Sequence, residues 1–374
     1  MEETVKKKAG RKTIDWVLVF IIVVLVLFGF LMVYSSSYPD GYYKFGGDPF
    51  YFLKKQVVAA IIGFIGMFFF AKIPYKLYAK FSKIIMLLSV GFALLTVVLG
   101  FASNGAQRWI QIGGMTLQPS EIIKIGGVLY MSDYFTKHRK NIGSFTAGFI
   151  QSMIFIGLFC LLIAVQDDLS TAVILGGTLI VMFFCAGARI SHLFMLILIA
   201  VAGIIVLIAM QPYRITRIIA FFDPFKYPKK EGFQIIQSLY ALGTGGLFGM
   251  GIGKSRQKFF YLPEAYNDFI FSIIGEELGF IGCVFVILGF VIFAWRGLRI
   301  SMNTTDFFGS QVALGLTTLV LIQFLIHVAV ATSSMPPTGR ALPFISAGGS
   351  SLTFLLCSMG ILLNISKYSN TYRN

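Results

Sequence analysis

Residues 16–34 read WVLVFIIVVLVLFGFLMVY, a run of 19 residues without a charged side chain. A helix needs about 20 predominantly apolar residues to cross the hydrocarbon core of a bilayer, so this run predicts a membrane-spanning helix. The apolar region of a secretory signal peptide is shorter, typically about 7–15 residues. We therefore expect the run to be retained as a first span.

Similar apolar segments recur along the chain and predict an all-α membrane domain with ten transmembrane helices over residues 16–366. Hydrophobic residues make up 57% of the chain and charged residues 13%, whereas soluble globular proteins average about 45–50% and about 25%. These proportions argue against a soluble domain, a disordered chain, a coiled coil and a nucleic-acid-binding protein. The nine further segments are 56–71, 84–102, 122–135, 146–165, 171–188, 190–210, 269–295, 307–331 and 351–366.

Lys and Arg are distributed unevenly between the two sets of connecting loops, and this distribution predicts the orientation. With the N-terminus in the cytoplasm, the inner loops and termini carry 17 of them and the short outer loops carry five. Positively charged residues concentrate on the cytoplasmic side of membrane proteins. We therefore expect cytoplasmic terminal segments at 1–15 and 367–374 in a multi-pass membrane protein.

Between the seventh and eighth predicted helices lies a large extracytoplasmic loop, 211–267, of 57 residues. It carries eight basic residues against three acidic ones, so its balance is positive although it is predicted to lie outside. Its apolar content argues against disorder, and loops of this length in compact proteins are usually functional. The sequence therefore indicates an ordered, basic outer loop suited to an anionic ligand.

Ionisable residues within or at the edge of predicted spans are candidates for function. One such group is Gln118, Ser120, Glu121 and Lys124. Pro119 and Ser120 mark the start of a helix, and residues three apart share one helix face, so Glu121 and Lys124 are expected to face each other. The alternative is a structural ion pair that offsets its own desolvation.

A second polar group, Asp167 and Asp168, lies at the outer end of the fifth predicted helix. Both acids precede a helix that Ser170 could cap, so they could simply interact favourably with the helix dipole.

A third group begins with Asp268, immediately before the eighth predicted helix, and continues with Glu276 and Glu277 further along it. Adjacent helical residues point about 100° apart, so at most one of these glutamates can share the side of Asp268. An Asp at a helix start is often only an N-cap, which is the alternative to a catalytic role.

The glycine-rich run 243–255 does not form a nucleotide-binding loop. A P-loop would need Gly at position 248, which is Phe248, and no GxGxxG register fits. Its backbone N–H groups and Lys254 could instead meet a lipid diphosphate. The stretch 336–351 is too polar and too rich in Pro and Gly for a regular helix. Irregular backbone near a membrane must be buried in protein or line a cavity, so we expect this stretch to form a cavity wall.

Together these segments resemble the SEDS family of bacterial cell-wall proteins, which includes FtsW, RodA and SpoVE. The resemblance extends over about residues 16–366, and the stretch 42–56 is similar to the FtsW/SpoVE branch in particular. The matching motifs, in family order, are GAQRWI at 105–110, QPSE at 118–121 with Lys124, QDDLSTA at 166–172, QIIQS at 234–238, NDFIF at 267–271, GEELG at 275–279 and PTG at 337–339. The chain departs from the family pattern at five positions, where the family usually has Pro, Gly, Asn, an apolar residue and Tyr. These are Asp167, Ser170, His327, Arg340 and Ala347.

The resemblance implies a peptidoglycan glycosyltransferase that polymerises lipid II at the outer face of the bacterial cytoplasmic membrane during cell division, elongation or sporulation. It places the catalytic acid at Asp268, either as the base for the acceptor hydroxyl or as a ligand of a divalent cation, Mg or Mn, with no nucleotide. The substrate-binding residues expected on this basis are Glu121, Lys124, Arg108, Gln118, Ser120, Lys254, Ser346 and Ser350. The implied partners are lipid II and undecaprenyl diphosphate, a class B penicillin-binding protein and other divisome or elongasome membrane proteins, with no nucleic acid.

Two other classes of function compete with the enzyme. A lipid II flippase would move the substrate without bond chemistry, but a transporter needs ionisable groups near the midplane and access from both faces. The acids here gather at the predicted outer ends of the helices, which favours the enzyme. A scaffold for division proteins would leave Asp268 and the Glu121/Lys124 pair without a purpose.

Overall fold

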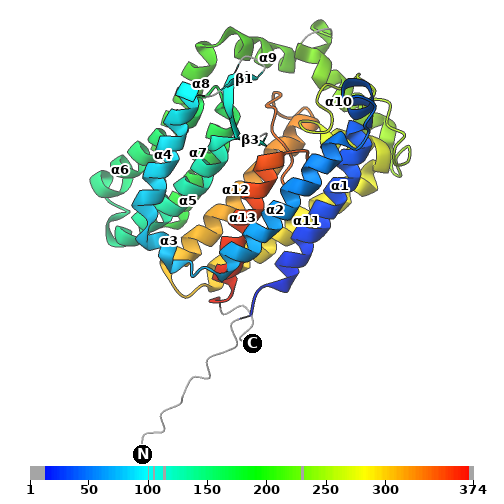
Figure 1. Cartoon of the computed structure of the whole chain (residues 1–374). Coiled ribbons are helices and arrows are strands. Elements are labelled where there is room, and N and C mark those ends of the chain that lie inside the picture. Colours follow the sequence, from blue (N-terminus) through cyan, green and yellow to red (C-terminus); the bar gives the residue numbers. More distant parts are fainter. Residues whose placement is uncertain (1–12, 100, 104–105, 113–114, 229–230, 370–374) are drawn as a thin grey trace, which may run out of the picture.

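The computed structural model describes residues 13–99, 101–103, 106–112, 115–228 and 231–369, which form a bundle of long helices (Figure 1). α12 (Phe307–Ala331) lies in the middle and contacts α11 (Ile270–Asn303) on one side and α5 (Pro119–Lys137) and α7 (Leu169–Cys185) on the other. α13 (Gly349–Ser366) packs beside it. The remaining long helices are α1 (Trp16–Lys44), α2 (Tyr51–Lys72), α4 (Ser82–Leu99), α6 (Gln151–Ala164) and α8 (Ile190–Ala209).

Each of the ten apolar segments corresponds to a helix in the described part of the chain. Six of them, α1, α2, α8, α11, α12 and α13, are long and apolar enough to cross a membrane. Three shorter apolar helices cover Ser82–Thr96, Gly148–Ala164 and Leu169–Cys185, and a π-helical turn, η2 (Phe145–Ile150), precedes α6. A helical membrane protein with several spans is therefore confirmed.

The structure adds to the sequence analysis in one region and corrects it in another. The loop 211–267 contains α9 (Pro212–Phe222), the short η3 (Pro224–Lys226) and α10 (Glu231–Gly245), which the sequence analysis did not predict. Its apolar residues form a helix face, and Ile235, Ile236 and Ala241 are buried. The predicted span 84–102 ends as a helix at Leu99, and β1 (Phe101–Ser103) pairs with β2 (Ala106–Ile112), which pairs with β3 (Met115–Leu117). A small antiparallel sheet thus interrupts the all-α pattern. Two short elements, α3 (Lys76–Lys80) and η1 (Arg139–Asn141), lie in the connections.

The helical backbone of α11 is interrupted at Gly279. The glycine-rich loop forms hydrogen bonds with the backbone groups on both sides of this interruption. Gly279 has φ 66° and ψ −161°, a conformation that only glycine adopts readily. The carbonyls of Glu276 and Glu277 accept hydrogen bonds from the N–H groups of Met250 and Gly251, both at 2.9 Å. Beyond the break, the N–H groups of Phe280 and Ile281 donate to the carbonyls of Gly246 and Leu247, at 2.9 and 3.2 Å. Since backbone polar groups in a membrane bundle need partners, these four bonds make the irregular turn tolerable.

Small residues allow α13 to approach α2 closely. A Cβ added at Gly360 of α13 would lie 2.3 Å from the carbonyl oxygen of Met67 in α2, so the two backbones are almost in contact. Helices in membranes associate through such close packing because lipid supplies no hydrophobic driving force between them.

We expect Gly360→Ala to lower the free energy of unfolding by about 1–3 kcal/mol, because the new methyl group must displace backbone rather than a flexible side chain. The melting temperature in detergent measures this. The matched control is Gly91→Ala in α4, where no atom lies within 4 Å of the added Cβ. That variant should melt at or above the wild-type temperature, since Ala is the better helix former. Equal melting temperatures for the two variants would contradict the packing argument.

Candidate active site

Residues 336–348 form most of the connection from α12 to α13 and contain no regular helix. Side chains of α12 and α2 hold their backbone. Gln323 donates to the carbonyl of Ala341 at 2.9 Å, and Nδ1 of His327 donates to the carbonyl of Arg340 at 2.7 Å. Gln56 of α2 donates to the carbonyl of Ser346 at 2.9 Å. We call residues 336–348 the central segment. It is fixed from several sides, as expected for irregular backbone within a membrane bundle.

Asp168 joins the central segment to the start of α5. Its carboxylate pairs with Arg340 at 2.7 Å and accepts a bond from Gln118 at 3.2 Å. It also caps α7, accepting from the N–H and the hydroxyl of Thr171 at 3.1 and 2.9 Å. Asp168, and not Ser170, is therefore the N-cap of this helix. Because its four contacts come from three different segments, the dipole-only interpretation of Asp168 is incomplete.

The departures from the family pattern gather around the same segment. The hydroxyl of Ser170 donates to the carbonyl of Thr338 at 3.0 Å, and His327 and Arg340 make the bonds described above. Asp167 has φ 56°, which a proline ring cannot adopt, and it pairs with Arg214 of α9 at 3.4 Å. Three of the five departures, Ser170, His327 and Arg340, therefore supply contacts between the central segment and its surroundings, whereas Asp167 contacts α9.

Glu121 and Lys124 form a buried ion pair at 2.9 Å near the start of α5, with side chains 6% and 3% exposed. α5 begins at Pro119 as predicted, with Gln118 as its N-cap residue. The ammonium of Lys124 also donates to Gln323 at 3.3 Å, the residue that holds the carbonyl of Ala341. The pair is thus linked to the central segment through one amide side chain.

Asp268 also lies against the central segment, at Gly339. A Cβ built on Gly339, which has φ 64°, would be 3.1 Å from Oδ2 of Asp268. The residues before Asp268 are tied down, since Ser346 donates to the carbonyl of Asn267 at 2.7 Å and the N–H of Ala347 donates to the carbonyl of Tyr266 at 3.1 Å. Gly339 and Arg340 are neighbours, so Asp268 and Asp168 meet adjacent residues of one segment.

The helix that follows Asp268 begins at Ile270, with Phe269 as its N-cap residue and no side-chain cap. The N-cap interpretation of Asp268 is therefore wrong. Burial, with the carboxylate of Glu264 adding to it, raises the pKa of Tyr266, two residues before Asp268. Its phenol stays protonated at neutral pH and can donate a hydrogen bond.

The other predicted ligand residues have different surroundings. The hydroxyl of Ser346 is already engaged, because it also accepts from the N–H of Leu342 at 2.8 Å. The hydroxyls of Ser120 and Ser350 are buried and, within the described residues, have no hydrogen-bond partner. Lys254 is exposed on the glycine-rich loop. The side chain of Arg108 lies outside the described residues.

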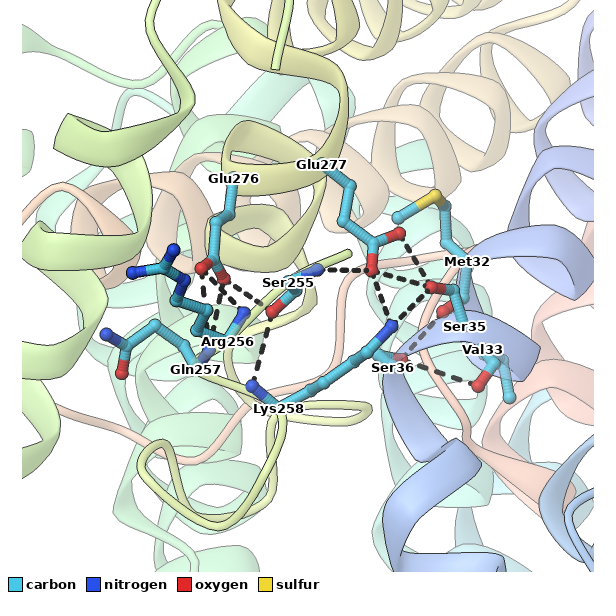
Figure 2. A network of polar contacts seen from close by, with 10 residues as sticks. All are labelled: Met32, Val33, Ser35, Ser36, Ser255, Arg256, Gln257, Lys258, Glu276 and Glu277. Carbon is cyan, nitrogen blue, oxygen red and sulfur yellow. Dashed lines mark hydrogen bonds and ion pairs between the residues drawn. The ribbon is translucent and has the colours of Figure 1, made fainter. Parts of the chain in front are cut away.

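A second polar cluster, which the sequence analysis did not assemble, lies two turns further along α11 (Figure 2). Glu277 pairs with Lys258 at 2.8 Å and accepts from the hydroxyl of Ser35 in α1, and all three side chains are buried. Glu276 points elsewhere, as expected for adjacent helical residues, and accepts from the hydroxyl of Ser255 and from the N–H of Arg256 at 2.9 Å. No spacing rule pairs residues 35, 258 and 277, so only the fold reveals the cluster.

The glycine-rich loop has little free backbone for a diphosphate. The N–H groups of Gly249, Met250, Gly251, Lys254 and Ser255 all donate within the protein. These five backbone N–H groups are therefore engaged within the protein, and the exposed side chain of Lys254 stays a candidate ligand for a diphosphate.

The site now has a definite chemical character. Asp268 lies beside Gly339 of the central segment, next in sequence to Arg340. The cations Lys124 and Arg340 are each held by a carboxylate. In comparison with known proteins, the family model described as cell cycle protein, FtsW/RodA/SpoVE, matches residues 15–371. The chain belongs to the FtsW/RodA/SpoVE family.

Relatives in the FtsW/RodA/SpoVE family match nearly the whole chain. Stage V sporulation protein E of Bacillus subtilis is 46% identical over 359 residues, covering 95% of this chain and 97% of that protein. A probable peptidoglycan glycosyltransferase FtsW of Geobacter sp. strain M18 is 41% identical over 354 residues, covering 94% and 96%. The predicted resemblance, including its FtsW/SpoVE character, is confirmed.

Solved structures show the same fold. A chain from a peptidoglycan synthase complex that coordinates polymerization and crosslinking superposes with a TM-score of 0.79 at 24% identity, covering 97% of this chain and 99% of that one. RodA of Thermus thermophilus superposes with a TM-score of 0.68 at 23% identity, with the same coverage.

The buried Glu121–Lys124 pair gives a direct test of the interior of this site. Lys124→Ala should lower the free energy of unfolding by about 3–5 kcal/mol, because it leaves Glu121 buried without its counterion. The double variant Glu121→Ala with Lys124→Ala removes both charges and should recover most of that loss. Thermal unfolding in detergent measures both variants, with Lys44→Ala as control, since Lys44 pairs with Asp40 but is exposed. A double variant less stable than Lys124→Ala would disprove the desolvation argument.

Proposed function

We propose that this chain polymerises lipid II as a peptidoglycan glycosyltransferase at the outer face of the bacterial cytoplasmic membrane. The single observation that supports this most directly is the position of Asp268, which lies against Gly339 of the central segment, next in sequence to Arg340. Relatives named as probable peptidoglycan glycosyltransferases are 39–41% identical across nearly the full chain. The process served is cell division, elongation or sporulation.

The proposed topology has ten spans, with both termini in the cytoplasm. The two described ends meet, because the N–H of Asp15 donates to Ser366 at 3.1 Å and Asp15 also pairs with Arg296. An even number of spans brings the ends of a chain to one side, which supports this topology. In Figure 1, α9 and α10 lie across the opposite end of the bundle, which in this proposal is extracytoplasmic.

In the proposed reaction, the carboxylate of Asp268 takes the proton of the acceptor sugar hydroxyl as that oxygen forms the new glycosidic bond. The bond between the anomeric carbon and the diphosphate oxygen breaks with inversion, and undecaprenyl diphosphate leaves with the negative charge. Lys124, Arg340 and the exposed Lys254 are the cations that support this charge, with Arg108 as a further candidate. Gln118, Ser120, Ser346 and Ser350 orient the substrate or the segments that hold it.

Asp268 is compatible with a divalent cation that is bound by one carboxylate together with substrate phosphates and water. Among the described residues no three His, Cys, Asp or Glu side chains converge as a metal cage. Mg²⁺ is commonly held by one or two carboxylates together with substrate phosphates and water. Asp268 would hold Mg or Mn in that mode, and the ion would supply charge stabilisation for the diphosphate.

Asp268→Asn should reduce lipid II polymerisation by about 100-fold or more, in line with the loss of a general base. Folding should survive, since Asp268 does not cap α11 and Asn is nearly isosteric. The measurement is glycan polymer formed by purified protein in liposomes supplied with lipid II, together with the melting temperature.

Asp223→Asn is the matched control, because it makes the same chemical change at the cap of η3. It should polymerise lipid II normally. Near-normal polymerisation by Asp268→Asn would remove the catalytic assignment and favour a lipid II flippase.

A partner transpeptidase is proposed from the outer loop. Phe259, Phe260 and Tyr261 are 43%, 47% and 56% exposed outside the helices, and Phe248 is 78% exposed on the glycine-rich loop. Contiguous exposed apolar side chains mark interaction surfaces. We expect a single-pass class B penicillin-binding protein to cover this patch.

In mild detergent the wild-type chain should co-purify with its class B penicillin-binding protein. Tyr261→Ala together with Phe259→Ala should lower the amount of recovered partner about tenfold or more, since the complex loses two aromatic side chains that the partner would bury. Phe222→Ala on α9 is the control, because Phe222 is 80% exposed but lies outside the patch. Undiminished recovery with the double variant would place the interface elsewhere.

A further inference from the structure

A cavity of about 460 Å³ lies between α4, α5 and α6, away from the candidate active site. It is lined by Lys83 from α4, by Tyr130 and Tyr134 from α5, and by Gln151 and Phe155 from α6. Tyr134 is thirteen residues along α5 from Glu121, which places the cavity about 20 Å away at the other end of the helix. In the proposed topology this end faces the cytoplasm.

The walls of this cavity carry hydrogen-bond donors that have no acceptor among the described residues. The hydroxyl of Tyr134 donates to Oε1 of Gln151 at 2.6 Å. This bond orients the amide of Gln151 and leaves its NH₂ group available to donate to a ligand. Nδ1 of His138 donates to the carbonyl of Tyr134 at 3.0 Å, so Nε2 remains. Within the described residues, the ammonium of Lys83, the hydroxyl of Tyr130 and the NH₂ of Gln151 have no hydrogen-bond partner.

The charge around the cavity is positive. Asp133 is its one acid, and this carboxylate is already paired with Lys137 at 2.6 Å and bonded to the hydroxyl of Ser82. Lys83 therefore remains as an uncompensated cation. The neighbouring stretches 72–83 and 137–140 add further Lys and Arg and contain no acid. An anion would find both donors and a favourable potential here.

An apolar stripe continues from the cavity along α6. Ile154, which lines the cavity, is 55% exposed, and Leu158, Leu161 and Val165 follow it at 37%, 57% and 59%. Their spacing of four, three and four residues puts them on one helix face. This face suits an acyl chain, and a soluble anion has no use for it.

We propose that this cavity binds the phosphate headgroup of an anionic membrane lipid from the leaflet at this end of the bundle. Lys83 makes the charge-assisted contact, while Tyr130 and Gln151 donate to the phosphate oxygens. The acyl chains lie along the stripe on α6, so that the lipid joins α4 and α6 across α5. Basic recesses between helices on the cytoplasmic side are a known mode of lipid headgroup recognition. This site is separate from the one that contains Asp268.

The test is native mass spectrometry of the purified full-length chain in detergent, titrated with phosphatidylglycerol or with zwitterionic phosphatidylcholine. We expect one retained phosphatidylglycerol, and weaker retention of phosphatidylcholine. Lys83→Ala with Tyr130→Phe should weaken phosphatidylglycerol binding about tenfold, because a charge-assisted and a neutral hydrogen bond are lost. The ring of Phe at position 130 preserves the contact with Phe155, whose centroid lies 5.0 Å away.

The matched control is Lys76→Ala, which removes a cation from the same end of the bundle outside the cavity. It should retain phosphatidylglycerol like the wild type. An equal loss in this variant would show diffuse surface attraction and overturn the proposal. Full displacement of the lipid by inorganic phosphate would identify a site for a soluble anion and overturn it as well.

A separate measurement keeps a folding defect from being read as a binding defect. All variants should melt, in detergent without added lipid, within a few degrees of the wild type. If the double variant melts lower, the single Lys83→Ala variant decides, because Lys83 is exposed. Unchanged phosphatidylglycerol retention in a folded Lys83→Ala variant would refute the proposed headgroup contact.

Discussion

Much of this fold depends on one requirement, that backbone polar groups inside a membrane bundle find partners in the protein. In the central segment, side chains satisfy this requirement, since Gln323, His327 and Gln56 each donate a hydrogen bond to one of its carbonyls. At Gly279 of α11, backbone groups of the glycine-rich loop satisfy it. In both places irregular chain is permitted only because distant residues are present, so each irregular piece also fixes the relative positions of several helices.

Buried carboxylates, like the buried backbone groups, have partners within the protein. The buried carboxylates of Glu121, Asp168 and Glu277 are each paired with a Lys or Arg. Asp168 and Glu277 also accept further hydrogen bonds, and Lys124, the partner of Glu121, donates to Gln323. A buried pair of this kind contributes little net stability compared with apolar residues, but removing one partner is strongly destabilising. Such pairs therefore fix which segments meet more than they strengthen the fold. Around the candidate site, they hold the cations Lys124 and Arg340 in place.

The sequence was informative where a signal is local. Runs of apolar residues located the ten helices, Pro119 marked the start of α5, and a spacing of three paired Glu121 with Lys124. It was silent where contacts join distant positions, as with Lys258, Glu277 and Ser35, because no periodicity relates them. Helices inside the loop 211–267 were missed because a short amphipathic helix at a membrane surface has no apolar run long enough to be noticed. For Asp268, the sequence placed it beside a helix start, but only the φ and ψ angles showed that Phe269 occupies the cap.

The break in α11 has a consequence for how the protein is made. Residues 246–251, which bond to the broken ends, precede Gly279 in the chain by about 30 residues, so they leave the ribosome some seconds earlier at about 5–20 residues per second. When the later part of α11 enters the bilayer, the partners for its four exposed backbone groups already exist. The reverse order would leave those groups unpaired in lipid during insertion. The order of segments along the chain thus protects the weakest point of its longest helix during synthesis.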